Sequence, residues 1–150
     1  MTAPALPASW QLPFELAWEA LRAGSRPIGA VLLDGAGRPV ATGRNRSQES
    51  TAPPGQLAGT AIAHAEVNVL AQLPTGGHYE NHRLYTTLEP CLLCSGALIH
   101  SHVGHVLYAA PTRTGPASRT CPASAGRSPS AGPAGKAPPP LRSPRSARCS

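Results

Sequence analysis

The sequence predicts an α/β domain of three layers, α-β-α, built on a mixed sheet of about four strands. Short apolar runs closed by turn residues indicate the strands, and segments with apolar residues at helical spacing alternate with them. A third observation places two helices together, because both carry side chains suited to one metal ion. The length of 150 residues allows one domain of ordinary size.

The N-terminal part predicts one amphipathic helix after a lead-in. Residues 1–11 contain proline and show little periodicity, so we expect them to be loose. From Pro13 apolar residues recur at helical spacing, and Gly24 offers a stop. We expect Trp18, which belongs to this apolar set, to lie in the core. The set consists of Phe14, Ala17, Trp18 and Leu21.

Two short segments after this helix predict a β-hairpin. Residues 27–33 form an apolar run, and residues 40–45 follow after a turn rich in glycine at 34–37. Gly29 lies inside the first strand, where a glycine marks either a close approach of the backbone to a ligand or a β-bulge. Residues 47–60 form a long loop that could shape the entrance of a pocket.

The second half of the chain predicts two more helices and two more strands. The first helix is capped near Thr60, buries Ile62 and ends before Pro74. A strand at 83–87, a helix at about 91–101 and a strand at 105–110 follow. These segments complete a sheet of four strands.

Three residues on these two helices predict a catalytic zinc site. Cys91 and Cys94 are three apart behind Pro90, so both thiols project from the first turn of one helix. His64 supplies a third ligand, and the rest of the sequence supplies no convincing fourth. A structural zinc site is normally closed by four protein ligands, whereas a catalytic one leaves a position for water. Glu66, two residues after His64, is placed to take that water's proton.

These motifs resemble those of a known enzyme family. The triplet HAE with PCLLC, and the longer run TLEPCLLCSGALIHS, is similar to the zinc-dependent nucleoside and base deaminase superfamily, nearest its tRNA adenosine deaminase and guanine deaminase branch. The similarity covers roughly residues 12–111. It implies a cytidine-deaminase-like fold, a Zn²⁺ cofactor, Glu66 as the catalytic proton carrier and a homodimer.

The resemblance also implies substrate contacts. Asn45, in the GxN context Gly43-Arg44-Asn45, matches a family residue that hydrogen-bonds the base, although an Asn there can equally be a turn residue. Ala65 is a further expected substrate contact. Glu89 could bind a substrate amine or only cap the turn. Family members often carry Arg at the positions of His102 and His105. The absence of Arg at these positions weakens the case for a contact with RNA phosphate.

The predicted reaction is hydrolytic deamination of a nucleobase or nucleoside of the guanine, cytosine or adenine type. Three alternatives stay open: a tRNA adenosine deaminase, an inactive zinc-binding remnant, and a redox protein that uses Cys91 and Cys94 as a thiol pair. The HAE triplet has no role in the redox alternative. Free bases or nucleosides are favoured over tRNA because the net charge up to Pro111 is about −1, from six Arg against seven Asp and Glu.

The basic character of the chain belongs to its C-terminal segment. Residues 112–150 contain six Arg and one Lys but no acid, and their only large aliphatic residue is Leu141. Such a segment buries too little apolar area to offset chain entropy, so we expect a disordered tail. The family's last strand and helix are missing, and out-of-frame translation is our hypothesis for this shift. With no signal peptide or membrane span in the sequence, we expect a cytoplasmic protein.

Overall fold

The computed structural model describes residues 5–112, which contain three helices and four strands. The expected tail at 113–150 and residues 1–4 of the lead-in lie outside the described residues. The elements in chain order are α1 (Ala8–Arg22), β1 (Gly29–Leu33), β2 (Pro39–Arg44), α2 (Ala65–Leu70), β3 (Arg83–Leu88), α3 (Leu92–His100) and β4 (His105–Ala110). None of the helices between residues 5 and 112 has the length and apolar character of a membrane span.

The four strands form one mixed sheet in the order β2-β1-β3-β4. β1 is antiparallel to both of its neighbours, and β3 is parallel to β4. The predicted hairpin is β1 and β2; its turn is held by the Asp34 carboxylate, whose Oδ1 accepts hydrogen bonds from the Ala36 and Arg38 amides. Gly37 in this turn has a φ of +83°, a conformation that glycine adopts without strain.

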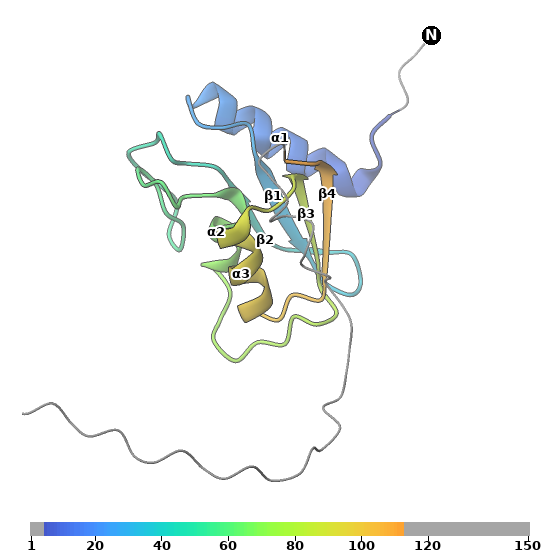
Figure 1. Ribbon diagram of the computed structural model, residues 1–150. Coiled ribbons are helices and arrows are strands. Elements are labelled where there is room, and N and C mark those ends of the chain that lie inside the picture. The colour runs from blue at the N-terminus through green and yellow to red at the C-terminus, as the bar shows by residue number, and fades with distance from the viewer. Residues whose placement is uncertain (1–4, 113–150) are drawn as a thin grey trace, which may run out of the picture.

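Helices cover both faces of the sheet, so the predicted three-layer α-β-α fold is confirmed (Figure 1). α1 packs on β1 and β3 from one side, while α2 packs on β2 and β1 from the other and contacts α3. All five residues of β1 are buried because this strand is central and covered on both faces. The main core lies between the sheet and α2 and α3, and consists of Ala30, Leu32, Ala41, Ala65, Val69, Tyr79, Leu84 and Leu98.

Gly29 serves helix packing, which corrects both expectations for it. A Cβ atom at this position would collide with the Pro13 carbonyl oxygen and with the Ala17 amide of α1. The register irregularity of β1 falls between Leu32 and Leu33, so Gly29 is not at the bulge. The absent side chain therefore lets α1 lie directly on β1.

Substitution of Gly29 by alanine is expected to destabilise the fold. The added methyl group must displace helix backbone rather than a flexible side chain, and overpacking of this kind costs about 1–3 kcal/mol. Chemical denaturation of Gly29→Ala should show the loss as a lower midpoint. Gly96→Ala is the matched control: nothing lies within 4 Å of its Cβ position, and α3 should gain from losing a glycine. Equal stability of the two variants would refute this account.

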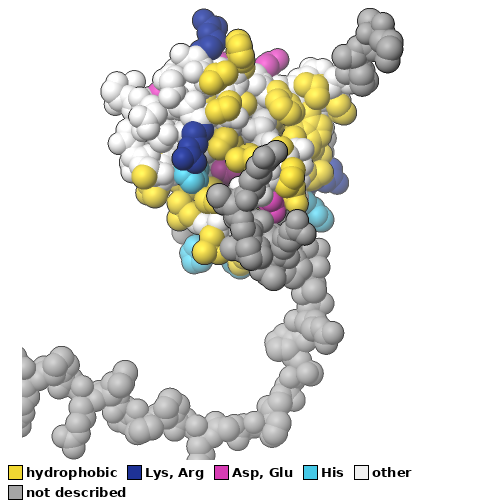
Figure 2. Space-filling view, turned by 45° about the horizontal axis from the view of Figure 1, so that its top comes forward, with side chains coloured by type: hydrophobic (Ala, Val, Ile, Leu, Met, Phe, Trp, Pro, Cys, Tyr) yellow, Lys and Arg dark blue, Asp and Glu magenta, His cyan; other side chains and the backbone are white. Residues whose placement is uncertain are grey.

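The expectation that Trp18 lies in the core is wrong, and the same close packing explains why. The buried residues of α1 are small, namely Pro13, Ala17 and Ala20. Trp18 points away from the sheet and is 62% exposed, and Phe14 and Leu21 are also exposed. Figure 2 shows hydrophobic side chains exposed over much of this side of the molecule.

Several boundaries also differ from the expected ones. α1 begins at Ala8, inside the segment expected to be loose, and Trp10 in its first turns packs edge-on against Tyr85 of β3. This aromatic contact with the sheet stabilises the first turns of α1. Ile62 is 48% exposed rather than buried, because it precedes the helix, whose N-cap is His64 rather than a residue near Thr60.

Candidate metal centre

The candidate site is formed where the N-termini of α2 and α3 meet. His64 is the N-cap residue of α2, and Cys91 is the N-cap residue of α3. Both have extended backbone angles and neither makes a side-chain capping hydrogen bond, so their side chains are free to turn toward each other. Cys94 lies in the first turn of α3 and is buried. The N-terminal ends of both helices favour anionic ligands such as thiolates.

The three side chains are close enough to share one metal ion. His64 Nδ1 lies 3.4 Å from Cys94 Sγ and 3.5 Å from Cys91 Sγ, and the two sulfur atoms are 3.6 Å apart. Ordinary Zn–S and Zn–N bonds at a tetrahedral angle require ligand atoms roughly 3.6–3.8 Å apart. The donor set and its spacing therefore fit zinc. Among residues 5–112 this is the one group of three or more His, Cys, Asp or Glu side chains arranged to hold a metal.

The charge balance of the site also favours a bound cation. The pKa of the Cys94 thiol is raised, first because burial disfavours the thiolate and then because Glu66 and Cys91 add negative charge nearby. A dication compensates all three effects and stabilises the thiolate form that binds it. Cys91 is exposed and His64 is half-buried, so the site is open to solvent on their side.

Glu66 lies beside the candidate ligands, in the first turn of α2. It is 4% exposed, and its two carboxylate oxygens have different partners. Oε1 accepts a hydrogen bond of 2.9 Å from the Thr86 hydroxyl of β3, and Oε2 lies 3.4 Å from Cys94 Sγ, which donates to it. A buried carboxylate next to the ligand atoms can hold or pass on a proton at Oε2.

The expected substrate contacts lie on three different segments of the chain. Asn45 directly follows β2 and is buried, and its Oδ1 accepts hydrogen bonds from the Ser47 amide and hydroxyl. Ala65 is the buried first residue of α2. Glu89 follows β3, and its Oε2 accepts a hydrogen bond of 2.9 Å from the Thr112 amide. Their roles toward a substrate stay predictions.

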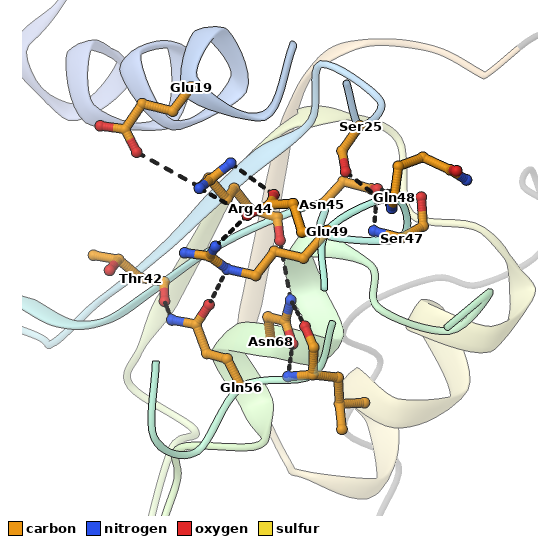
Figure 3. A network of polar contacts seen from close by, with 12 residues as sticks. Glu19, Ser25, Thr42, Arg44, Asn45, Ser47, Gln48, Glu49, Gln56 and Asn68 are labelled. Atoms are coloured by element: carbon orange, nitrogen blue, oxygen red, sulfur yellow. Dashed lines mark hydrogen bonds and ion pairs between the residues drawn. The ribbon is translucent and has the colours of Figure 1, made fainter. Parts of the chain in front are cut away.

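A partly buried polar network, which the sequence analysis did not identify, holds the loop after β2 (Figure 3). The Glu49 carboxylate binds the guanidinium groups of both Arg44 and Arg46, and Arg46 also donates to the Gln56 side chain. Arg44 further lies 3.6 Å from Glu19 of α1. A glutamate three and five residues after two arginines is the sequence signal that could have predicted these ion pairs. The network fixes the segment that carries Asn45.

Asn68 connects the same loop to α2. Its side chain is fully buried, accepts a hydrogen bond from the Leu57 amide, and donates to the carbonyl oxygens of Leu57 and Arg44. The Asn68 side chain therefore supplies hydrogen-bond partners to backbone groups of the loop that form no bond within a helix or strand. The sequence held one signal for this role of Asn68: it is a polar residue at a position of α2 that faces the core.

Asn68→Ala is expected to destabilise the fold by about 1–3 kcal/mol, because the buried Asn68 amide no longer supplies its hydrogen bonds to the backbone of Leu57 and Arg44. The denaturation midpoint should fall, and limited proteolysis should cut within the loop at 47–60 first. Asn81→Ala, at an exposed position, is the matched control and should change neither result. A wild-type midpoint for Asn68→Ala would contradict the assigned role.

Comparison with known families agrees with this geometry. The model of the cytidine and deoxycytidylate deaminase zinc-binding region matches residues 9–110. The chain belongs to this deaminase family. The family membership and the zinc cofactor predicted from the HAE and PCLLC motifs are thereby confirmed, with His64, Cys91 and Cys94 forming a possible metal site.

The relatives include a protein of the expected tRNA adenosine deaminase branch and one with a different name. A tRNA-specific adenosine deaminase of Haemophilus influenzae is 36% identical over 101 residues, which are 64% of this chain and 53% of the relative. A tRNA(Ile)-lysidine synthase of Deinococcus radiodurans is 35% identical over 98 residues, 63% of this chain and 16% of that protein. The chain thus spans about half or less of these two relatives.

Solved structures of deaminases show the same fold. A guanine deaminase from Bacillus subtilis has a TM-score of 0.57 and 31% identity, with 71% of this chain and 66% of that chain covered. A structure from a study of A-to-I editing by tRNA:A34 deaminases has a TM-score of 0.56 and 30% identity, covering 70% of this chain and 76% of that one. The cytidine-deaminase-like fold is confirmed.

Proposed function

We propose that this chain is a zinc-dependent hydrolytic deaminase that releases ammonia from an amino-substituted nucleobase or nucleoside. The observation that carries the proposal is the convergence of His64 Nδ1 and two cysteine sulfurs within 3.4–3.6 Å, with the Glu66 carboxylate beside them. Three protein ligands leave one position of a tetrahedral zinc site free. A zinc ion held there supplies a water molecule whose pKa is lowered toward neutrality.

Glu66 then carries the proton chemistry. Hydrolytic deamination consumes one water and replaces the exocyclic amine by an oxygen, so one proton must reach the ring nitrogen and another the departing ammonia. Oε2 is the oxygen that faces the ligand cluster, and we assign it the transfer of these protons. Positioned general acid–base catalysis of this kind contributes about 10²- to 10⁴-fold to the rate.

Asn45 and Ala65 are proposed to bind the base, and Glu89 its amine. Because Asn45 Oδ1 is engaged by Ser47, its Nδ2 amide is the group left to donate to a ring or carbonyl acceptor. Glu89 uses one oxygen for the Thr112 amide, which leaves Oε1 to accept from an amine. The expected homodimer is also a proposal, which light scattering of the purified chain tests.

A free base or nucleoside is the substrate class that we favour. Three of the arginines among residues 5–112 are ion-paired with carboxylates: Arg38 with Asp34, and Arg44 and Arg46 with Glu49. Their charge is not free to bind a phosphate backbone. Modification of adenosine in tRNA is the second candidate, favoured by the identity to the Haemophilus tRNA-specific adenosine deaminase.

The test is ammonia release by the zinc-loaded full chain. The panel consists of guanine, adenine, cytosine, their nucleosides, and an RNA anticodon stem-loop with adenosine at the wobble position. Release from a free base or nucleoside supports the favoured substrate class, and release from the RNA alone supports the second. A folded chain with one zinc per molecule that releases ammonia from none of them overturns the proposal in favour of an inactive zinc-binding remnant.

A further inference from the structure

Thr86 is a buried polar residue whose hydroxyl takes no part in the backbone hydrogen bonds between strands. It lies in β3, is completely buried, and faces the α2 side of the sheet opposite Ala30 of β1. Its neighbours on the same face of β3, Leu84 and Leu88, are apolar, and valine has the same shape as threonine. Burial of a hydroxyl is unfavourable unless it is hydrogen-bonded. A threonine at this position therefore needs a hydrogen-bond partner for its hydroxyl.

That partner is Glu66. Thr86 Oγ1 lies 2.9 Å from Glu66 Oε1 and 3.2 Å from the Leu88 carbonyl oxygen. The contact joins residues 20 apart in sequence, and it ties the first turn of α2 to the centre of the sheet. The terminal torsion of a glutamate is broad and nearly two-fold, so packing alone does not fix which oxygen points where. The hydroxyl has one proton to donate, and the shorter of its two contacts, 2.9 Å against 3.2 Å, is the one to Oε1, so it holds that oxygen in place.

As a consequence, the two carboxylate oxygens of Glu66 have different roles. With Oε1 anchored to Thr86, Oε2 faces Cys94 Sγ at 3.4 Å, on the side of the candidate ligands. We propose that Thr86 is a positioning residue for Glu66: its hydroxyl holds Oε1 on the sheet so that Oε2 stays beside the metal ligands. This inference rests on the proposed function, in which Oε2 moves the protons of the reaction.

The next residue, Thr87, provides a matched control within the same strand. It is also buried, but its side chain faces the α1 side of the sheet, where Oγ1 accepts a hydrogen bond of 3.2 Å from the Gly29 amide. Removal of this hydroxyl leaves a backbone amide without a partner and does not touch Glu66. Thr86→Val and Thr87→Val therefore make the same chemical change with different expected results.

The experiment compares the zinc-loaded full chain with Thr86→Val, Thr86→Ser and Thr87→Val, on the substrate that gives the highest ammonia release. We expect Thr86→Val to keep one zinc per chain and to lower kcat by about 10- to 100-fold with KM changed less than about threefold, since a misplaced catalytic group costs rate rather than binding. Thr86→Ser restores the hydroxyl and should recover most of kcat. Thr87→Val should lower the melting temperature while kcat stays near the wild-type value.

Three outcomes would overturn the inference: a wild-type kcat for Thr86→Val, no recovery in Thr86→Ser, or an effect on KM alone. Crystal structures of zinc-loaded wild type and Thr86→Val give a readout that needs no substrate. We expect the Glu66 carboxylate to rotate or shift in the variant, and an unchanged carboxylate would reject the positioning role. If the wild type releases no ammonia, the proposed function fails, and the paired structures still decide what Thr86 does to Glu66.

Discussion

Replacement of Glu66 by glutamine is expected to lower ammonia release by at least about 100-fold while the chain keeps one zinc ion. Glutamine has nearly the same shape and can still accept the Thr86 hydrogen bond through its amide oxygen, so the fold and the ligand cluster are retained. The amide cannot take up and return protons at the position of Oε2, and the loss of general acid–base catalysis costs about 10²- to 10⁴-fold. Initial rates of ammonia release, together with zinc analysis by mass spectrometry, measure both parts.

Glu80→Gln is the matched control, because the Glu80 side chain is 63% exposed and lies on the loop before β3. It removes the same charge by the same chemical change and should leave kcat at the wild-type value. An active Glu66→Gln variant would disprove the proton-carrying role of Glu66. Loss of zinc in Glu66→Gln would instead show that Glu66 is needed to assemble the site.

Replacement of Cys94 by serine is expected to abolish zinc binding and to remove the stabilisation that zinc gives. The ion would join the starts of α2 and α3 through His64, Cys91 and Cys94, so its binding free energy adds to the folding free energy. At a free zinc concentration 1,000 times the dissociation constant, that contribution is about 4 kcal/mol. At about 4–8 °C for each kcal/mol in a domain of this size, the melting temperature should fall by more than about 10 °C.

The measurement is a thermal melt of wild type and Cys94→Ser, each with added zinc and with a chelator. We expect chelation to lower the wild-type melting temperature and to leave that of Cys94→Ser unchanged. A double variant, Cys121→Ser with Cys149→Ser, replaces the two cysteines outside the described residues and should respond to zinc as the wild type does. A normal zinc response in Cys94→Ser would show that the metal binds elsewhere.

The candidate ligands could be predicted from the sequence because their relation is mostly local. Cys91 and Cys94 share the first turn of α3, and the spacing of three residues fixes that geometry once a helix begins behind Pro90. The contact of His64 with the two cysteines is not local. It was inferred because one metal ion needs all three side chains as ligands. The hairpin of β1 and β2 was likewise predictable, because the turn at 34–37 brings the two strands together.

Other features depended on how closely the layers approach. Trp18 belongs to an apolar pattern that suggests burial, yet α1 turns its small residues toward β1 because Gly29 lets the two backbones come together. The distance between the backbones of α1 and β1 cannot be predicted from the helical period or from the residue types. For the same reason, the partner of Thr86 could not be found from the strand it occupies, since Glu66 reaches it from a different layer.

By itself, the sequence determined the order of helices and strands, and it singled out His64, Cys91 and Cys94 as candidate ligands with Glu66 beside them, because helical period, the spacing of each motif and the ligand demand of one metal ion are all written in it. The tertiary structure alone decided which face of α1 is buried, how Asn68 holds the loop after β2, and which oxygen of Glu66 faces the ligands. These depend on contacts between segments distant along the chain, and their distances are set by packing of whole layers rather than by any local pattern.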